Sequence, residues 1–126
     1  MKYMGLDYGT KRIGIAISDE EGQFAFPKSI IASDAHAVAI INQIAREEGV
    51  TGIVLGESLA TNEEPNEIIL QTLRFKEKLA TATGITVFLE REGFSTVEAH
   101  RYQPKKGNRD DSAAAIILQR YLDRIA

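Results

Sequence analysis

Acidic residues in three distant parts of the sequence are candidates for a shared metal site. Asp7 ends a short apolar run just before a turn at Gly9, Glu90 and Glu92 follow a second apolar run, and Asp111 lies near the start of the last helical pattern. Carboxylates that converge repel each other unless a hard cation lies between them, and Mg²⁺ or Mn²⁺ takes oxygen ligands of this kind. Such a site can activate water and stabilise the leaving oxygen of a phosphodiester. The pattern therefore points to phosphodiester hydrolysis that needs neither cysteine nor histidine.

Each of these acids also has an ordinary structural explanation. Asp7 could bond the backbone of its own turn, as Asp often does before Gly, and a loop glutamate such as Glu92 is usually solvated. At roughly 100° per residue, Asp111 lies about 20° from Leu118 on the apolar stripe of its helix, whereas Asp110 lies about 80° away and is the better cap. The helix dipole also favours an acid in the first turn, so both roles of Asp111 stay open on the residues alone.

Basic residues flank the same segments and could bind phosphate groups. The net charge of -3 means that contact with a nucleic acid must come from a local patch rather than from the whole molecule. A merely solvated charged surface is the alternative. The candidates for phosphate contacts are Lys11, Arg12, Arg101, Lys105, Lys106 and Arg109.

The apolar patterns predict the elements that must position these residues. Residues 2–19 predict a hairpin of two strands, and Pro27 places the strand after it at a sheet edge. Strands that are separated by a helix are most simply parallel. We therefore expect an α/β fold with a five-stranded mixed sheet, three antiparallel strands followed by two parallel strands, flanked by helices. The strands after the hairpin are predicted over 23–31, 50–55 and 85–89, and the helices over 35–48, 65–83, 95–103 and 111–125.

Alternation along the hairpin separates small from large side chains. Asp7 shares one face of the first strand with Gly5, and in the second strand the small residues oppose three isoleucines. We expect Ser33 or Asp34 to cap the first helix and Gly49 to end it.

Composition predicts one ordinary globular domain over residues 1–126, with 44% apolar and 26% charged residues. The absence of cysteine excludes disulfides and thiolate metal sites. His36 and His100 lie on different predicted helices, so we do not expect them to share a metal. No apolar stretch approaches the roughly 20 residues of a membrane span, and we predict a cytoplasmic protein without membrane contact. Nothing in the sequence selects an oligomeric state.

Three segments resemble the YqgF family of pre-16S ribosomal RNA nucleases and Holliday junction resolvases, which belongs to the ribonuclease H-like superfamily. They are LDYGTKRIGIAISD at 6–19, STVEA at 95–99 and DDSAAAIILQRYLD at 110–123. The resemblance implies a ribonuclease H-like fold, cleavage of phosphodiesters that depends on Mg²⁺ or Mn²⁺, and maturation of small-subunit ribosomal RNA. Structured precursor RNA or branched DNA is the implied substrate. The family acids fall on Asp7 and Asp111, and Glu92 keeps the family carboxylate.

Two segments depart from the family pattern. Gly56-Glu57-Ser58-Leu59 stands in place of Gly-Leu-Pro-Leu, and Arg91-Glu92-Gly93 stands in place of Asp-Glu-Arg. A nucleic-acid-binding protein that lacks nuclease activity is therefore an alternative. A third hypothesis is an actin-like nucleotide phosphotransferase, because residues 7–10 also resemble a phosphate-binding turn. Such sites lie between two domains, and 126 residues leave room for one.

Overall fold

The computed structural model describes residues 1–57, 65–90 and 109–126. The predicted helix over 95–103 lies outside these ranges. The strands are β1 (Tyr3–Tyr8), β2 (Arg12–Ser18), β3 (Ala25–Ala32), β4 (Gly52–Glu57) and β5 (Thr86–Glu90), and the helices are α1 (Ala37–Glu48), α2 (Pro65–Thr83) and α4 (Arg109–Ile125).

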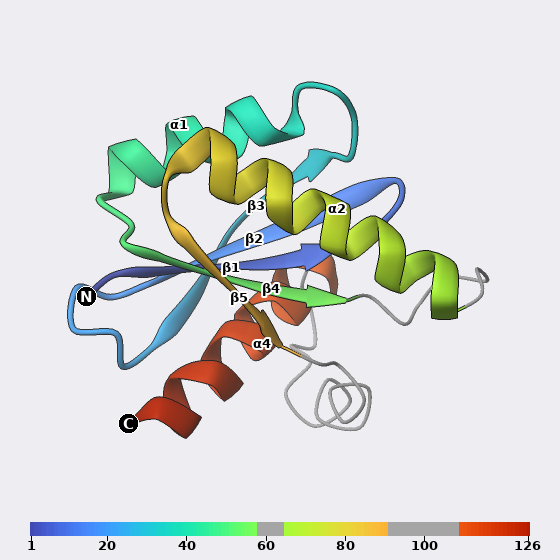
Figure 1. Ribbon diagram of the computed structural model, residues 1–126. Helices are drawn as coiled ribbons and strands as arrows, with labels where there is room; N and C mark the ends of the chain where they lie inside the picture. The colour runs from blue at the N-terminus through green and yellow to red at the C-terminus, as the bar shows by residue number, and fades with distance from the viewer. Residues whose placement is uncertain (58–64, 91–108) are drawn as a thin grey trace.

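The strands form one mixed sheet in the order β3-β2-β1-β4-β5 (Figure 1). β2 pairs antiparallel with both β1 and β3, whereas β4 pairs parallel with β1 and β5 pairs parallel with β4. The prediction of three antiparallel strands followed by two parallel strands is confirmed. β1 lies at the centre, so its carboxyl end is bordered by two strands.

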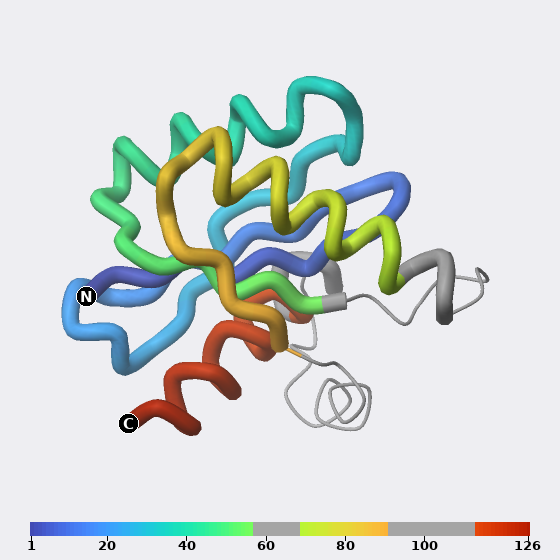
Figure 2. The backbone as a smooth tube through the Cα atoms, in the orientation of Figure 1, coloured from blue at the N-terminus to red at the C-terminus, as the bar shows by residue number. Residues whose placement is uncertain are grey.

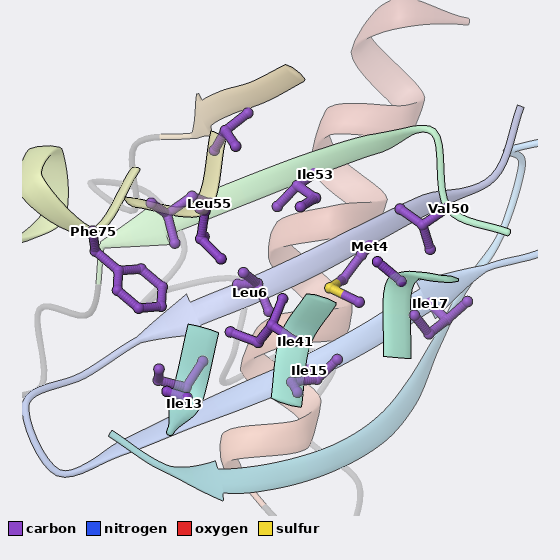
Figure 3. Packing of buried hydrophobic residues seen from close by; sticks show 14 residues of the cluster. Met4, Leu6, Ile13, Ile15, Ile17, Ile41, Val50, Ile53, Leu55 and Phe75 are labelled. Carbon is purple, nitrogen blue, oxygen red and sulfur yellow. The ribbon is translucent and has the colours of Figure 1, made fainter. Parts of the chain in front are cut away.

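One face of the sheet carries α1 and α2, over a core of large apolar side chains (Figure 1). Leu6 and Ile15 from the central strands lie close to Ile41 of α1 in this core (Figure 3). Phe75 and Leu79 of α2 belong to the same cluster. Burial of each such side chain contributes about 1.5–3 kcal/mol, so this face anchors the sheet.

Among the described elements, α4 is the helix that covers the opposite face of the sheet, where β1 and β2 present small residues to it at Gly5 and Ala16. The backbone of α4 runs on the other side of the sheet from α1 and α2 (Figure 2). A Cβ atom built on Gly5 would lie 2.6 Å from Leu118 Cβ and 3.0 Å from the carbonyl oxygen of Ala114. Ala16 of β2 is fully buried in the same cluster. The predicted separation of small and large residues is thus confirmed, and it lets α4 lie directly on the strands.

Several predicted boundaries differ from the observed ones by one or two residues. α1 begins at Ala37 without a side-chain cap, because Asp34 instead accepts a hydrogen bond from the His36 amide (2.8 Å) in the turn before the helix. The expected cap at Ser33 or Asp34 is therefore wrong. Gly49, in the left-handed region at φ 70°, ends the helix as predicted. The fourth strand covers 52–57 rather than 50–55, since its parallel pairing follows β1 to the last residue of that strand.

Candidate active site at the carboxyl end of the central strand

Asp7 lies at the carboxyl end of β1, on the face that carries α4. Its side chain is 9% exposed. In the antiparallel pairing its partner is Gly14, and in the parallel pairing its partner is Gly56. Neither neighbouring strand therefore places a side chain directly beside this carboxylate.

The first turn of α4 lies toward Asp7. Tyr121 contacts the Tyr3 ring at a centroid distance of 5.8 Å, and one turn earlier Leu118 covers Gly5. Moving toward the start of α4 therefore means moving along β1 toward its carboxyl end. Asp111 lies three residues before Ala114, or about 4.5 Å along the helix axis, and Asp7 lies about 6.8 Å beyond Gly5. The backbone of the first turn thus lies near the level of Asp7, whereas the side chain of Asp111 lies outside the described part of the chain.

Glu90, the other acid considered after the last strand, is occupied by an ion pair. Its side chain is 3% exposed. The guanidinium of Arg124 donates two hydrogen bonds to its carboxylate, at 2.5 and 3.2 Å, and Nε of Arg120 lies 3.7 Å from Oε2. Because the charge of this carboxylate is already balanced by two arginine side chains, Glu90 is a poor ligand for a metal ion. Glu92 remains the acid assigned to this segment, and it lies outside the described residues.

Lys11 and Arg12 form the exposed end of the β1–β2 hairpin, next to the site. A Cβ atom on Gly9 would lie 2.7 Å from the carbonyl oxygen of Arg12, so the turn is tight. The carbonyl of Lys11 accepts a hydrogen bond from the Ser33 amide at 2.9 Å, which ties the turn to the end of β3. Both side chains are exposed. Of the other predicted phosphate contacts, Arg101, Lys105 and Lys106 lie outside the described residues, as does the side chain of Arg109 at the start of α4.

A family model described as RuvX, Holliday junction resolvase, matches residues 1–124. The chain belongs to this family. A "Putative pre-16S rRNA nuclease" of Ruminiclostridium cellulolyticum is 36% identical over 137 residues, which cover 100% of this chain and 96% of the relative. A protein of the same name from Oleidesulfovibrio alaskensis is 33% identical over 133 residues, covering 98% and 92%. The resemblance found in the sequence is confirmed.

Solved structures share the fold of this RuvX family member. RuvC of Thermus thermophilus, in complex with a Holliday junction substrate, superposes with a TM-score of 0.66 at 11% identity, covering 100% of this chain and 97% of the other. The fowlpox virus Holliday junction resolvase gives 0.54 at 17% identity, covering 98% and 99%. A ROK hexokinase of Thermus thermophilus gives 0.52 at 23% identity, covering 87% of this chain but 39% of the hexokinase. The last likeness is one of fold alone.

The described residues fit an oxygen-ligated cation at Asp7, and they supply one carboxylate for it. No three His, Cys, Asp or Glu side chains gather into a metal-binding group within the parts of this RuvX family member that the structure describes. The predicted partners, Glu92 and Asp111, are the two whose side chains lie outside those parts. The chemistry of Asp7 suits Mg²⁺ or Mn²⁺, since it is a nearly buried carboxylate whose register partners in both neighbouring strands are glycines. The complete ligand set stays a prediction.

Two features of the site were missed from the sequence. The glycine neighbours of Asp7 come from strands that follow it by 7 and 49 residues, so only the register reveals them. The ion pair of Glu90 joins residues 34 apart. The spacing of Arg120 and Arg124, one helical turn apart, was the available signal for a shared anionic partner.

Proposed function

We propose that this chain is a metal-dependent nuclease, formed by one domain over residues 1–126, that hydrolyses phosphodiesters in precursor 16S ribosomal RNA in the cytoplasm. The observation that carries the proposal is the position of Asp7, a nearly buried carboxylate between two glycines at the carboxyl end of the central strand. Membership of a nuclease family supports it, as does the name of the curated relatives.

Asp7, Glu92 and Asp111 would hold Mg²⁺ or Mn²⁺ in this proposal. A bound cation of this type supplies Lewis-acid activation of water and offsets the charge of the phosphate. Asp7 would bind the cation from the carboxyl end of β1, and Asp111 would provide a further ligand from the first turn of α4. Glu92 would complete the set or orient the attacking water. The glycines at 14 and 56 add no side chain of their own beside Asp7 in the two neighbouring strands.

Basic side chains would position the substrate by contacts to its phosphates. Lys11 and Arg12 are exposed at the turn that follows Asp7, so they could contact phosphates beside the one that is cleaved. We propose the same role for Arg101, Lys105, Lys106 and Arg109. Because these contacts carry no base information, substrate choice would rest on the shape of the structured RNA.

A four-way DNA junction is the second candidate substrate. The description of the matching family favours it, since it names Holliday junction resolvases. Loss of nuclease activity on the same fold is the third possibility, because Arg91-Glu92-Gly93 replaces Asp-Glu-Arg beside the proposed ligand.

One cleavage assay separates these possibilities. Purified protein is incubated with labelled precursor 16S RNA or with a labelled four-way junction, each with Mn²⁺ and with EDTA. We expect Mn²⁺-dependent cutting of the RNA. Preferential cutting of the junction would select the second candidate, and binding of either substrate without cutting would select the third.

Aspartate variants connect the assay to the site. Asp7→Asn and Asp111→Asn should each abolish cutting, whereas Asp123→Asn, a control on the exposed end of α4, should cut like the parent. Full activity of Asp7→Asn would contradict the assignment of the site.

A further inference from the structure

Phe24 and Phe26 are the most exposed large apolar side chains among the described residues after Met1, at 59% and 56%. Phe26 is paired with Ile17, whose side chain belongs to the core under α1 and α2. Side chains alternate along an extended chain, and Ala25 between the two phenylalanines packs toward α4 instead. The two rings therefore lie on the same face of the sheet and form one apolar patch rather than two isolated contacts.

Hydrogen bonds hold the segment that carries the two rings. The Asp19 carboxylate accepts the amides of Gln23 at 2.7 Å and Phe24 at 3.0 Å, and the Asp19 amide donates to the Phe24 carbonyl at 3.0 Å. From α4, the side chain of Gln119 accepts the Ala25 amide and donates to the Gln23 carbonyl, both at 2.9 Å. The backbone under the rings is thus ordered before any partner binds, which lowers the entropic cost of association.

Carboxylates surround the two rings. Glu20 and Glu21 are exposed in the turn that precedes them, next to Asp19. On the other side, the exposed carboxylate of Asp123 accepts a hydrogen bond at 3.0 Å from Gln119, the residue that also binds the segment. We call this region the Phe24–Phe26 surface, and it consists of Phe24, Phe26, Asp19, Glu20, Glu21 and Asp123.

Nearby cations do not balance these carboxylates. Lys28, two residues after Phe26, lies 3.1 Å from Glu48, which also binds Lys2 at 2.9 Å. The amino group of Met1 donates to a backbone carbonyl, that of Glu20, at 3.1 Å. Within residues 1–57, 65–90 and 109–126 the structure shows no salt bridge to the four carboxylates of the Phe24–Phe26 surface. The surface therefore combines exposed aromatic rings with a net negative charge.

This charge selects among the possible occupants of the surface. Phosphates of a nucleic acid or of an anionic membrane would be repelled by four carboxylates. A second copy in a two-fold contact would bring the same carboxylates against their equivalents. Addition of a strand along the edge is also hindered, because Pro27 has no amide hydrogen and the Ala25 amide is already bound by Gln119. A positively charged protein segment that binds through its side chains fits both the rings and the charge.

We propose that the Phe24–Phe26 surface docks a basic segment of a protein partner. Apolar side chains of the segment pack on the two rings, and its guanidinium groups stack on the rings or pair with the surrounding carboxylates. The turn before β3 lies at the end of the molecule that carries the N-terminus, whereas β1 points toward the other end (Figure 1). The docked segment therefore lies at the end of the sheet opposite Asp7, and this binding function is separate from the proposed cleavage.

Two double variants and two matched controls test the proposal. Phe24→Ala/Phe26→Ala removes the rings, and its control Leu70→Ala/Leu73→Ala removes two exposed apolar side chains of α2, at 55% and 40%. Glu20→Lys/Glu21→Lys reverses the charge, and it still tests the surface if loss of the rings impairs folding. Its control, Glu47→Lys/Glu77→Lys, makes the same change of net charge at exposed positions of α1 and α2.

Binding is measured by fluorescence anisotropy with a labelled peptide of about 12 residues in which arginine alternates with leucine, and with its glutamate-for-arginine counterpart. Labelled single-stranded RNA and sedimentation of the protein alone examine the other occupants. We expect the arginine peptide to bind the parent, and Phe24→Ala/Phe26→Ala to weaken it about 10-fold or more. Glu20→Lys/Glu21→Lys should weaken it about 10-fold at about 0.05 M NaCl and less at about 0.5 M, because salt screens the charges. Both controls should bind like the parent.

Failure of the parent to bind the arginine peptide would overturn the inference, as would equally tight binding of the glutamate peptide or an equal loss in the matched controls. If removal of the rings abolishes RNA binding or a dimer of the parent instead, the surface serves a nucleic acid or a second copy, and the inference is wrong. Cleavage of precursor RNA should be the same in the parent and in both surface variants. A parent that binds the peptide but does not cut would contradict the proposed function alone, so the two failures are distinguishable.

Discussion

Substitution of Gly5 by alanine tests whether the seating of α4 on the sheet controls the site. The added Cβ would lie 2.6 Å from Leu118 Cβ and 3.0 Å from the carbonyl oxygen of Ala114. Carbon atoms in contact lie about 3.5–4.0 Å apart, so α4 must move away from β1 by about 1 Å. Because Gly5 lies two residues before Asp7 on the same face, the displacement acts directly beside the proposed metal site.

The structure allows the effect on folding to be separated from the effect on activity. Overpacking of this kind typically costs about 1–3 kcal/mol, which corresponds to a fall in Tm of roughly 4–12 °C for a chain of this length. A domain with the usual stability of about 5–15 kcal/mol stays folded at 25 °C after such a loss. A misplacement of about 1 Å at the reacting groups, in contrast, can lower the rate about 100-fold. We therefore expect Gly5→Ala to be folded and nearly inactive.

The assay combines circular-dichroism melting with RNA cleavage rates in Mn²⁺, expressed per folded molecule. Gly52→Ala is the matched control, since its Cβ would lie 2.7 Å from two carbons of the Tyr3 ring, on the same face but at the amino end of β1. That ring can tilt without moving the first turn of α4. Gly52→Ala should therefore melt earlier but cut at a rate close to that of the parent. A Gly5→Ala protein that cuts as fast as Gly52→Ala would refute the reasoning.

Further predictions concern the metal and the dependence of stability on pH. Mn²⁺ at 100 times its dissociation constant should stabilise the parent by about 2.7 kcal/mol in thermal melts, and it should leave the Tm of Asp7→Asn unchanged; an equal rise in both would contradict Asp7 as a ligand. Hydrogen bonds from Lys2 and then Lys28 lower the pKa of Glu48 below its ordinary value of 4.5. The stability that this carboxylate contributes is thus present above pH 4.5 and lost as the pH falls through the lowered pKa, so Glu48→Gln should flatten the acid limb of urea unfolding measured against pH. Burial raises the pKa of Tyr121 above its ordinary value of 10.0, so the folded state keeps this phenol protonated while the unfolded state ionises. Stability should fall as the pH rises above about 10, and Tyr121→Phe should reduce that fall; an unchanged alkaline limb would contradict burial of the phenol.

Hydrophobic patterning was enough to predict the sheet because each strand carries its own signal. In β2, Ile13, Ile15 and Ile17 lie on one face and small residues lie on the other. A shift of the strand by one residue would exchange the two faces, so a single register places the isoleucines under α1 and α2 and the small residues under α4. Element ends were less predictable. β4 continues to Glu57 because β1 offers it a partner at Tyr8, and this information lies in the pairing rather than in the segment itself.

The candidate site likewise contains features that its own sequence segments reveal and features that depend on distant residues. Asp7 could be predicted, because an acid that ends an apolar strand is visible in the sequence. The glycines beside Asp7 and the ion pair of Glu90 could not be predicted, since both depend on residues that only the fold brings together. By residue type and place in the chain Glu90 and Glu92 look alike, and the family resemblance assigned the metal ligand to Glu92. The pairing of Glu90 with Arg120 and Arg124, on a helix that comes later in the chain, is visible only in the fold.

The asymmetry of the sheet explains why the proposed site can exist on the α4 side alone. On the side of α1 and α2, Leu6 and Leu55 fill the space around the central strands. Tyr8, the residue after Asp7, packs its ring against that of Phe75, with the two ring centroids 4.7 Å apart. On the α4 side the same strands present Gly5 under the helix and only glycines beside Asp7. The small residues therefore act twice: near the middle of β1 they let α4 lie close to the strand, and at its end they place no side chain of a neighbouring strand beside the carboxylate. A larger side chain under the helix would displace its first turn, and one at position 14 or 56 would lie directly beside Asp7, where the proposed cation would bind.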